Sequence, residues 1–410
     1  MLLRVNHSHV SSFLTAAKHV LLAVSISALS AAMPATRAAP AQPSTLTIGY
    51  LGHPGQPPIN PLPLDELAPN EGLAGAQMGL VDDNTTGRFT GQKFVLAPVV
   101  LPRGGDLHNA VAGLAAKTPF VVTKLPAEEL KLVAKSFPKL TFINAGSRSD
   151  ALRNKECIAN VLHTIPSRAM LTDALAQYLA WKKWSNWFLV VGPTKADKLY
   201  AAAIKRSAAK FGMNIVSEKP WTFQTANSHA DTGHATLQTE IPAFTRGIDY
   251  DVLIVADEAG TFGENLIDRT QLPRPVAGTQ GLVATGWTPV NDEWGALQLQ
   301  NRFYKKFKRH MTARDYAAWI AVRAIGEAAV RAHTVDPAAV LKFMRSPDFL
   351  VSGFKSEGQS FRSWNGQMRQ PILIAGPHVL VSSSPQAGFL HQTSVLDTLG
   401  IDKGESQCKP

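Results

Sequence analysis

The side chains that could do chemistry in this chain form no arrangement typical of an enzyme. His229, Asp231 and His234 offer two imidazoles and a carboxylate, but their spacing matches no helical zinc motif, and zinc needs three or four placed ligands. Asp82 and Asp83 read as a solvated helix end, where adjacent acids rarely act as a catalytic pair. No serine or cysteine stands in a recognisable nucleophile elbow. We therefore expect no enzymatic activity, no metal ion and no other cofactor.

The basic residues show no concentration typical of nucleic-acid binding. The formal net charge is +10, and it becomes +7 when Arg4, Lys18 and Arg37 are removed with an N-terminal leader. The densest basic group lies at 305–309 and reads as the solvated face of a helix. We expect no nucleic-acid partner.

The first residues have the features of a secretory signal peptide. A charged start is followed by an apolar run at 20–32 and by small residues around Ala38, which is the pattern of a cleaved leader. The apolar run is too short to span a bilayer. We expect export and removal of residues 1–38, with cleavage after Ala41 as the alternative.

Cys157 and Cys408 are the two cysteines of the chain. In an oxidising compartment an isolated pair is often bridged, and a bridge here would tie down a C-terminus that otherwise frays. Two free thiols are the alternative.

The helices and strands that would position functional side chains begin with a strand, a helix and a second strand. Residues 45–51 alternate as a strand does, and 94–101 form a second apolar run. Between them, small residues from Leu73 to Val81 predict a helix that presses close to a sheet. The cluster Asn84–Gly87 is expected to end that helix, as such residues often do.

Helical and strand patterns then alternate, which predicts α/β architecture with parallel sheets flanked by helices. The expected helices are 107–117, 126–136, 167–184 and 196–211, and the expected strands are 119–123, 140–144, 161–166, 187–192, 214–216 and 251–256. Asp106, Ser167 and Gly212 are predicted at helix ends. Residues 293–344 read as nearly all helix, and 361–375 as a hairpin turning at Asn365–Gly366, with a last strand at 378–382.

Two α/β series, a return of helices and a final hairpin together resemble the type I periplasmic binding protein fold, nearest to the branched-chain amino acid receptors. A narrower resemblance is to the ABC transporter substrate-binding proteins associated with pyrroloquinoline-quinone-dependent alcohol dehydrogenase systems. The segments that carry it are Ala256–Glu258, Pro273–Gly281, Trp294–Phe303, Asp315–Trp319 and Leu396–Gly400.

The resemblance implies two lobes joined by a multi-strand hinge, with a cleft that closes around a small solute. The first lobe would comprise residues 45–164 and 286–350. The second would comprise 165–285 and 351–392, followed by a C-terminal tail at 393–410.

The resemblance also places ligand loops after several strands, where open α/β sheets bind their ligands. Carried over position by position, these loops are 123–127, 145–149, 194–198, 256–260 and 279–280. The candidate ligand residues are Lys124, Leu125, Ala145, Gly146, Ser147, Asp197, Asp257, Glu258 and Gln280. Ser147 and the neighbouring N–H groups would bind a carboxylate, and Asp257 or Glu258 would hold an amine or hydroxyl groups.

The chain departs from the amino acid receptors in two of these loops. Residues 124–127 read Lys-Leu-Pro-Ala where the receptors carry small hydroxyl residues, and Gln280 stands where they carry an acid. The ligand class stays open between an amino acid and another small polar metabolite, an alcohol-derived product or a cofactor-related compound.

The implied function is that of a periplasmic protein that captures a small polar ligand and delivers it to an ABC permease of the inner membrane, linked to quinoprotein alcohol oxidation. The alternative is an accessory or sensor protein that serves the quinoprotein dehydrogenase without transport.

Overall fold

A computed structural model of the chain describes residues 43–57, 66–223 and 231–408, with side chains from 237 onward in the last range. The expected signal peptide and His229 lie outside these ranges. Within them, every helix is too short or too polar to cross a membrane.

Five parallel strands form sheet A, in the order β2-β1-β3-β4-β5. The strands are β1 (Ser44–Gly52), β2 (Gln92–Val100), β3 (Phe120–Lys124), β4 (Thr141–Asn144) and β5 (Val161–His163). The helices between them are α1 (Leu73–Thr90), α2 (Leu107–Ala115) and α3 (Ala127–Ser136). This is the alternation that the sequence predicts for this half of the chain.

Seven strands form sheet B, in the order β14-β13-β10-β9-β8-β6-β7. They are β6 (Asn186–Val191), β7 (Asn214–Pro220), β8 (Val252–Ala256), β9 (Val276–Gly278), β10 (Leu282–Thr285), β13 (Ile372–Ala375) and β14 (Leu380–Ser384). Its helices are α4 (Arg168–Trp181), α5 (Lys195–Phe211) and α6 (Asp231–Thr245). Strands β13 and β14 run antiparallel, so sheet B is mixed at that edge rather than parallel throughout.

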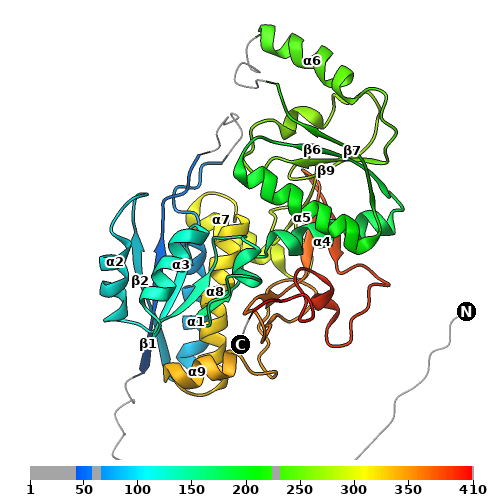
Figure 1. Cartoon of the computed structure of the whole chain (residues 1–410). Helices are drawn as coiled ribbons and strands as arrows, with labels where there is room; N and C mark the ends of the chain where they lie inside the picture. The colour runs from blue at the N-terminus through cyan, green and yellow to red at the C-terminus, as the bar shows by residue number, and fades with distance from the viewer. Residues whose placement is uncertain (1–42, 58–65, 224–230, 409–410) are drawn as a thin grey trace, which may run out of the picture. The chain divides into compact units, whose positions relative to one another are not determined.

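The remaining described elements belong to neither sheet. They are α7 (Ala296–Phe307), α8 (Ala313–Arg331), α9 (Pro337–Met344), the hairpin β11 (Ser360–Phe361) and β12 (Met368–Arg369), and the short turns η1 (Ala151–Arg153), η2 (Gly263–Leu266) and η3 (Val395–Thr398). In Figure 1, α8 in yellow lies beside α1, so the chain returns to sheet A after β10.

Helices cover both faces of each sheet. One core joins a face of sheet A to α1, α7, α8 and α9, and a second joins the other face to α2 and α3. Sheet B packs α4 and α5 on one face and α6 on the other. The predicted α/β architecture is confirmed, including the caps Asp106, Ser167 and Gly212.

The small residues of α1 serve contact with another helix. A Cβ at Gly75 would overlap the carbonyl oxygen of Asp315, and one at Gly79 would lie 2.8 Å from the carbonyl oxygen of Trp319. A Cβ at Gly326 in α8 would overlap the carboxylate of Asp83. The expected close packing of α1 against the sheet is found, since α1 contacts β2 and shares a core with sheet A, and these glycines in addition let the backbones of α1 and α8 approach each other.

The predicted helix end at Asn84–Gly87 is wrong. Helix α1 continues to Thr90 and ends at Gly91, whose φ of 66° is left-handed. The Asn84 side chain bonds the backbone N–H and carbonyl of Phe94 in β2, and a Cβ at Gly87 would lie 2.5 Å from the Gln92 carbonyl oxygen. Asn84 and Gly87 therefore serve the contact between α1 and β2 and do not end the helix.

The pair Asp82 and Asp83 is likewise not a solvated helix end. Asp83 is buried and pairs with Arg323 of α8, while Asp82 pairs with Arg302 of α7 and accepts a bond from the Trp319 indole at 2.9 Å. Burial raises the pKa of Asp83 to about 7, against the opposing effect of Arg323. The acids are placed by cations that are distant in the sequence.

Three chain segments cross side by side between the sheets. The Gln370 side chain donates to the carbonyl of Thr164 at 2.7 Å, and the Gln367 side chain donates to the carbonyl of Ile165 at 3.2 Å. A Cβ at Gly286 would lie 3.1 Å from Pro166. The segments that follow β5, follow β10 and precede β13 are therefore held together by hydrogen bonds and by side-chain packing.

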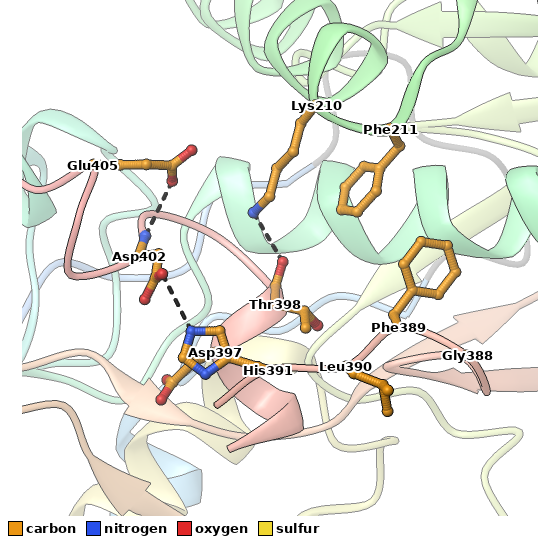
Figure 2. Close-up of a pocket in the computed structure, with 10 residues that line it drawn as sticks. All are labelled: Lys210, Phe211, Gly388, Phe389, Leu390, His391, Asp397, Thr398, Asp402 and Glu405. Atoms are coloured by element: carbon orange, nitrogen blue, oxygen red, sulfur yellow. Dashed lines mark hydrogen bonds and ion pairs between the residues drawn. The ribbon is translucent and has the colours of Figure 1, made fainter. Parts of the chain in front are cut away.

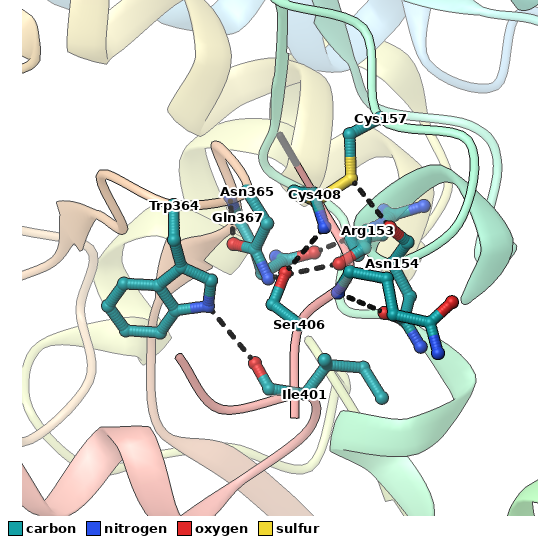
Figure 3. The surroundings of a disulfide bond; sticks show 10 residues. Arg153, Asn154, Cys157, Trp364, Asn365, Gln367, Ile401, Ser406 and Cys408 are labelled. Atoms are coloured by element: carbon teal, nitrogen blue, oxygen red, sulfur yellow. Dashed lines mark hydrogen bonds between the residues drawn. A yellow bond between two sulfur atoms is a disulfide. The ribbon is translucent and has the colours of Figure 1, made fainter. Parts of the chain in front are cut away.

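A disulfide joins Cys157 to Cys408, so the predicted bridge is confirmed. The Cα atoms are 5.4 Å apart across a sequence separation of 251 residues. Figure 3 shows the bridge beside Arg153 and Asn154, and the Gln407 N–H donates to the Asn154 side chain at 2.7 Å. Residues 407 and 408 are thereby held next to η1.

Replacing Gly75 by alanine should lower the free energy of unfolding by about 3 kcal/mol, because the added methyl group forces α1 and α8 apart. Urea denaturation measures this. The matched control is Gly113→Ala in α2, where an added Cβ meets nothing within 4 Å and helix propensity should stabilise the protein by about 0.5–1 kcal/mol. Equal effects of the two variants would contradict the helix packing described here.

Replacing Cys408 by serine should lower the thermal unfolding midpoint, since the chain-entropy model gives about 5 kcal/mol for closing so long a loop. Calorimetry with and without a reductant measures this. The double variant Cys157→Ser/Cys408→Ser should match the single one, which separates loss of the bridge from the effect of a free thiol. A midpoint unchanged in both variants would contradict a stabilising bridge.

Candidate ligand-binding site

Lys124 is the last residue of β3, the middle strand of sheet A, and forms an ion pair at the carboxyl end of that strand. Its ammonium lies 3.5 Å from the carboxylate of Glu71, and the guanidinium of Arg314 lies 3.5 Å from the same carboxylate. Burial lowers the pKa of Lys124, and Glu71 opposes this in part. Burial would raise the pKa of Glu71, but Arg314 and Lys124 hold it below its ordinary value. Glu71 is therefore held as a carboxylate between two cations.

A buried carboxylate positions Glu71. Asp315 sits in the first turn of α8 and accepts bonds from the Gly72 N–H at 2.7 Å and from the Arg309 guanidinium at 2.5 and 3.1 Å. It forms a capping box with Thr312, whose hydroxyl also reaches Glu71 at 3.0 Å. The Asp315 carboxylate thus bonds groups at the starts of both α1 and α8. Glu71 is the residue just before Gly72, which donates to this carboxylate.

The loop after β4 packs tightly on the loop after β3. A Cβ at Gly146 would lie 2.8 Å from the Cα of Lys124, so only glycine allows this approach. The side chains of Leu125 and Ala145 are buried in the two cores of sheet A. These two residues shape the loops from within the cores.

The N–H groups expected to receive a carboxylate are already engaged. The Asn144 side chain accepts from Gly146 N at 3.1 Å and from Ser147 N at 2.8 Å. The Ser147 carbonyl accepts from Arg153 at 2.9 Å, and the Ser147 hydroxyl accepts from Ser149 N at 3.4 Å. The hydroxyl of Ser147 can still donate a hydrogen bond.

Three of the residues expected in sheet B hold their own loops together. The Asp257 carboxylate accepts bonds from the N–H groups of residues 261, 262 and 263 and from the Thr261 hydroxyl, at 2.7–3.2 Å. Asp197 completes a capping box and accepts from Ala259 N at 3.2 Å. Gln280 bonds Thr279 and the carbonyl of Asp257. Their polar atoms are directed inward.

Glu258 is different, because its carboxylate pairs with a residue of another element. It lies 2.6 Å from the guanidinium of Arg168, the first residue of α4. The backbone N–H of Arg168 donates to the Arg148 carbonyl at 3.1 Å. The loop after β8 in sheet B thus meets the loop after β4 in sheet A through Arg168.

Arg148 is the central side chain of this region. The pKa of its guanidinium is lowered to about 10, mainly by burial; Arg314 and Arg168 also lower it, and Glu258 and Glu71 oppose them. It therefore stays charged at neutral pH, and charged groups from the loops of both sheets affect its pKa. Its Nε is buried and has no hydrogen-bond partner among the described residues.

We call the six charged residues at this place the charge cluster: Glu71, Lys124, Arg148, Arg168, Glu258 and Arg314. Of the residues expected at the site, it contains Lys124 and Glu258. The other four are not among the residues expected from the sequence. Arg148 lies inside the expected loop 145–149, and Arg168 follows the predicted cap Ser167, so a charged residue next to an expected ligand loop is the sequence feature that indicates them.

The described residues also contain a cavity elsewhere, with a volume of about 390 Å³. It lies between the end of α5 and the C-terminal segment, and Figure 2 shows its polar groups bonded to one another. Lys210 reaches the Thr398 carbonyl at 2.9 Å, and His391 pairs with Asp402 at 3.2 Å. None of the expected ligand residues lines this cavity.

A metal centre has no candidate in the described part of the chain, where no group of three histidine, cysteine, aspartate or glutamate side chains comes together. The possible ligands at His229–His234 fall on residues whose side chains are not described.

Two α/β halves, each built on its own sheet, are joined by three crossing segments and carry polar loops at the strand ends. A family model described as a periplasmic binding protein matches residues 245–376, which is less than half of the chain. No curated protein matches the chain.

Solved structures share the architecture over most of the chain. A periplasmic binding protein from Burkholderia mallei aligns with a TM-score of 0.60 at 15% identity, over 89% of this chain and 98% of its own. A branched chain amino acid ABC transporter periplasmic ligand-binding protein from Burkholderia xenovorans gives 0.62 at 16%, over 83% and 94%. A substrate-binding protein from Desulfitobacterium hafniense in complex with Leu gives 0.59 at 17%, over 82% and 99%. The chain thus has the type I periplasmic binding protein fold.

Replacing Asp257 by alanine should cost about 3 kcal/mol of unfolding free energy, because it leaves several buried N–H groups without an acceptor. Chemical denaturation measures this. The control Asp249→Ala removes a carboxylate that is 98% exposed and should change stability by less than about 0.5 kcal/mol. An Asp257 variant as stable as the control would contradict the structural role and return this residue to the list of ligand contacts.

Proposed function

We propose that the protein is a periplasmic solute-binding receptor that captures a small ligand between two lobes and delivers it to an ABC importer. The observation that carries this proposal is the charge cluster, in which Arg148 follows a strand of sheet A and Glu258 follows a strand of sheet B. Ligands of open α/β sheets bind at the carboxyl ends of strands, and this is where the cluster lies.

We place one lobe on sheet A and the other on sheet B, with the three crossing segments as the hinge. The proposed boundaries are 45–164 with 286–350, and 165–285 with 351–392, followed by the tail at 393–410. Val351, Phe361 and Met368 pack in the core of sheet A, which favours moving the last boundary toward β13. A solute that contacts Arg148 and Glu258 together would favour the closed arrangement.

The proposed contacts are chosen from the residues that face the charge cluster. Lys124, Gly146, Ser147 and Glu258 remain from the expected set, joined by Arg148. Asp197, Asp257 and Gln280 support the loops around them, and Leu125 and Ala145 shape those loops from within the cores of sheet A.

Export and the partner follow from the same proposal. The leader pattern at residues 1–38 supports secretion, and the disulfide suits an oxidising compartment. A solute receptor of this kind needs an inner-membrane permease as its partner, and the solved relatives named above include proteins described as parts of ABC transporters.

A narrower proposal links the receptor to alcohol oxidation by a pyrroloquinoline quinone enzyme. It rests on the five family-like segments of the sequence, of which Asp315–Trp319 and Leu396–Gly400 form buried structural ties. The alternative is an accessory or sensor protein that docks on the dehydrogenase. Co-elution with that enzyme, in the absence of any bound solute, would favour this alternative.

The receptor function is tested on protein purified from a periplasmic extract, whose intact mass also reports the cleavage site. Thermal unfolding is followed with amino acids, small alcohols, aldehydes, carboxylates and pyrroloquinoline quinone. A ligand at a hundred times its dissociation constant adds about 2.7 kcal/mol, enough for a clear rise in the midpoint. We expect one class of small solute to stabilise the protein and to reduce its radius of gyration in X-ray scattering.

Stabilisation by the quinone alone would move the proposal to the accessory role. Turnover of any of these solutes by the purified protein would contradict a receptor without enzymatic activity.

A further inference from the structure

The charge cluster has more positive than negative charge. Four cations, at positions 124, 148, 168 and 314, face two carboxylates, at 71 and 258. Two neighbouring carboxylates do not alter this balance, because Asp315 is neutralised by Arg309 and Asp150 lies beside Arg153. The cluster therefore has an excess of two positive charges.

Both carboxylates of the cluster are already paired. Glu71 lies between Lys124 and Arg314, and Glu258 is held by Arg168 at 2.6 Å. An ammonium group on a ligand would have to replace one of these cations. The positions next to the two carboxylates, which would suit an amine, are thus occupied by the protein's own cationic side chains.

Arg148 is the cation without such a partner. No carboxylate lies within ion-pair distance of it among the described residues, whereas the other three cations each have one. Its buried Nε has no acceptor, and an unsatisfied buried donor on a charged group costs free energy unless a partner arrives. A guanidinium offers parallel N–H groups that match the two oxygens of a carboxylate.

Tyr200 adds a neutral donor beside the same guanidinium. It is buried in α5, and burial and Glu258 raise its pKa, so the phenol keeps its proton at neutral pH. Ser147, one residue before Arg148 in the sequence, has a hydroxyl that can also donate. Both can donate to an anion, while neither can neutralise a cation.

We propose that the ligand is a small organic anion, a carboxylate without an ammonium group, with one carboxylate bound to the guanidinium of Arg148. This inference rests on the proposed receptor function and narrows its ligand class away from zwitterionic amino acids. A dicarboxylate would match the excess of two positive charges, its second carboxylate lying toward Lys124 and Arg314.

The test is isothermal titration of the whole exported protein with succinate, lactate, leucine, glycerol and inorganic phosphate. We expect succinate or lactate to bind and leucine and glycerol to bind at least tenfold more weakly. Arg148→Gln should weaken carboxylate binding at least tenfold. Arg148→Lys should fall between, because it keeps the charge but loses the paired N–H groups.

The matched control is Arg88→Gln, which removes an exposed arginine from the far end of α1 and should leave affinity unchanged. The thermal midpoint of each unliganded variant verifies folding, and Arg148→Lys serves if Arg148→Gln does not fold.

Tight binding of leucine that survives Arg148→Gln would overturn the anion inference and leave the receptor function standing. Binding of phosphate but of neither carboxylate would overturn the assignment to an organic acid. Binding of no carboxylate overturns the inference, while the wider solute screen decides the receptor function separately.

Discussion

The buried carboxylate of Asp315 is the interaction on which the rest of this structure depends. It caps α8, accepts the N–H at the start of α1 and pairs with Arg309. The glycines of α1 permit the backbone approach that this tie needs. The Thr312 hydroxyl of the same capping box bonds the Glu71 carboxylate. The packing of α1 on α8 therefore also fixes the position of this carboxylate near the carboxyl end of a strand. The fold and the site are therefore built from one set of contacts.

Features decided by neighbouring residues could be predicted from the sequence. Ser167 and Gly212 act within one turn of their own helices, and the hairpin turn at Gly366 needs only a local positive φ of 66°. Asn84 and Gly87 do not end the helix as predicted, because the residue types that often end helices here contact a strand. Asp83 is not solvated as predicted, because its partner Arg323 lies 240 positions further along the chain.

The candidate site follows the same division. Its loops could be placed, since strand ends are visible in the pattern of apolar runs. The sequence does not predict which side chains of these loops point away from the protein. Asp257 and Asp197 accept hydrogen bonds from backbone N–H groups whose positions depend on tertiary structure. Arg148 acquires its role only through Glu258, Arg314 and Arg168, which come from other elements. The family-like segments are also informative here, since Asp315 and Asp397 specify packing rather than ligand chemistry.

A crystal structure of the protein grown with succinate would show whether Arg148 receives an acidic solute where the loops of the two sheets meet. We expect a carboxylate within hydrogen-bond distance of the Arg148 guanidinium, with Glu258 still paired to Arg168. Succinate bound instead through Asp257 and Gln280, or only in the cavity beside Lys210, would contradict it.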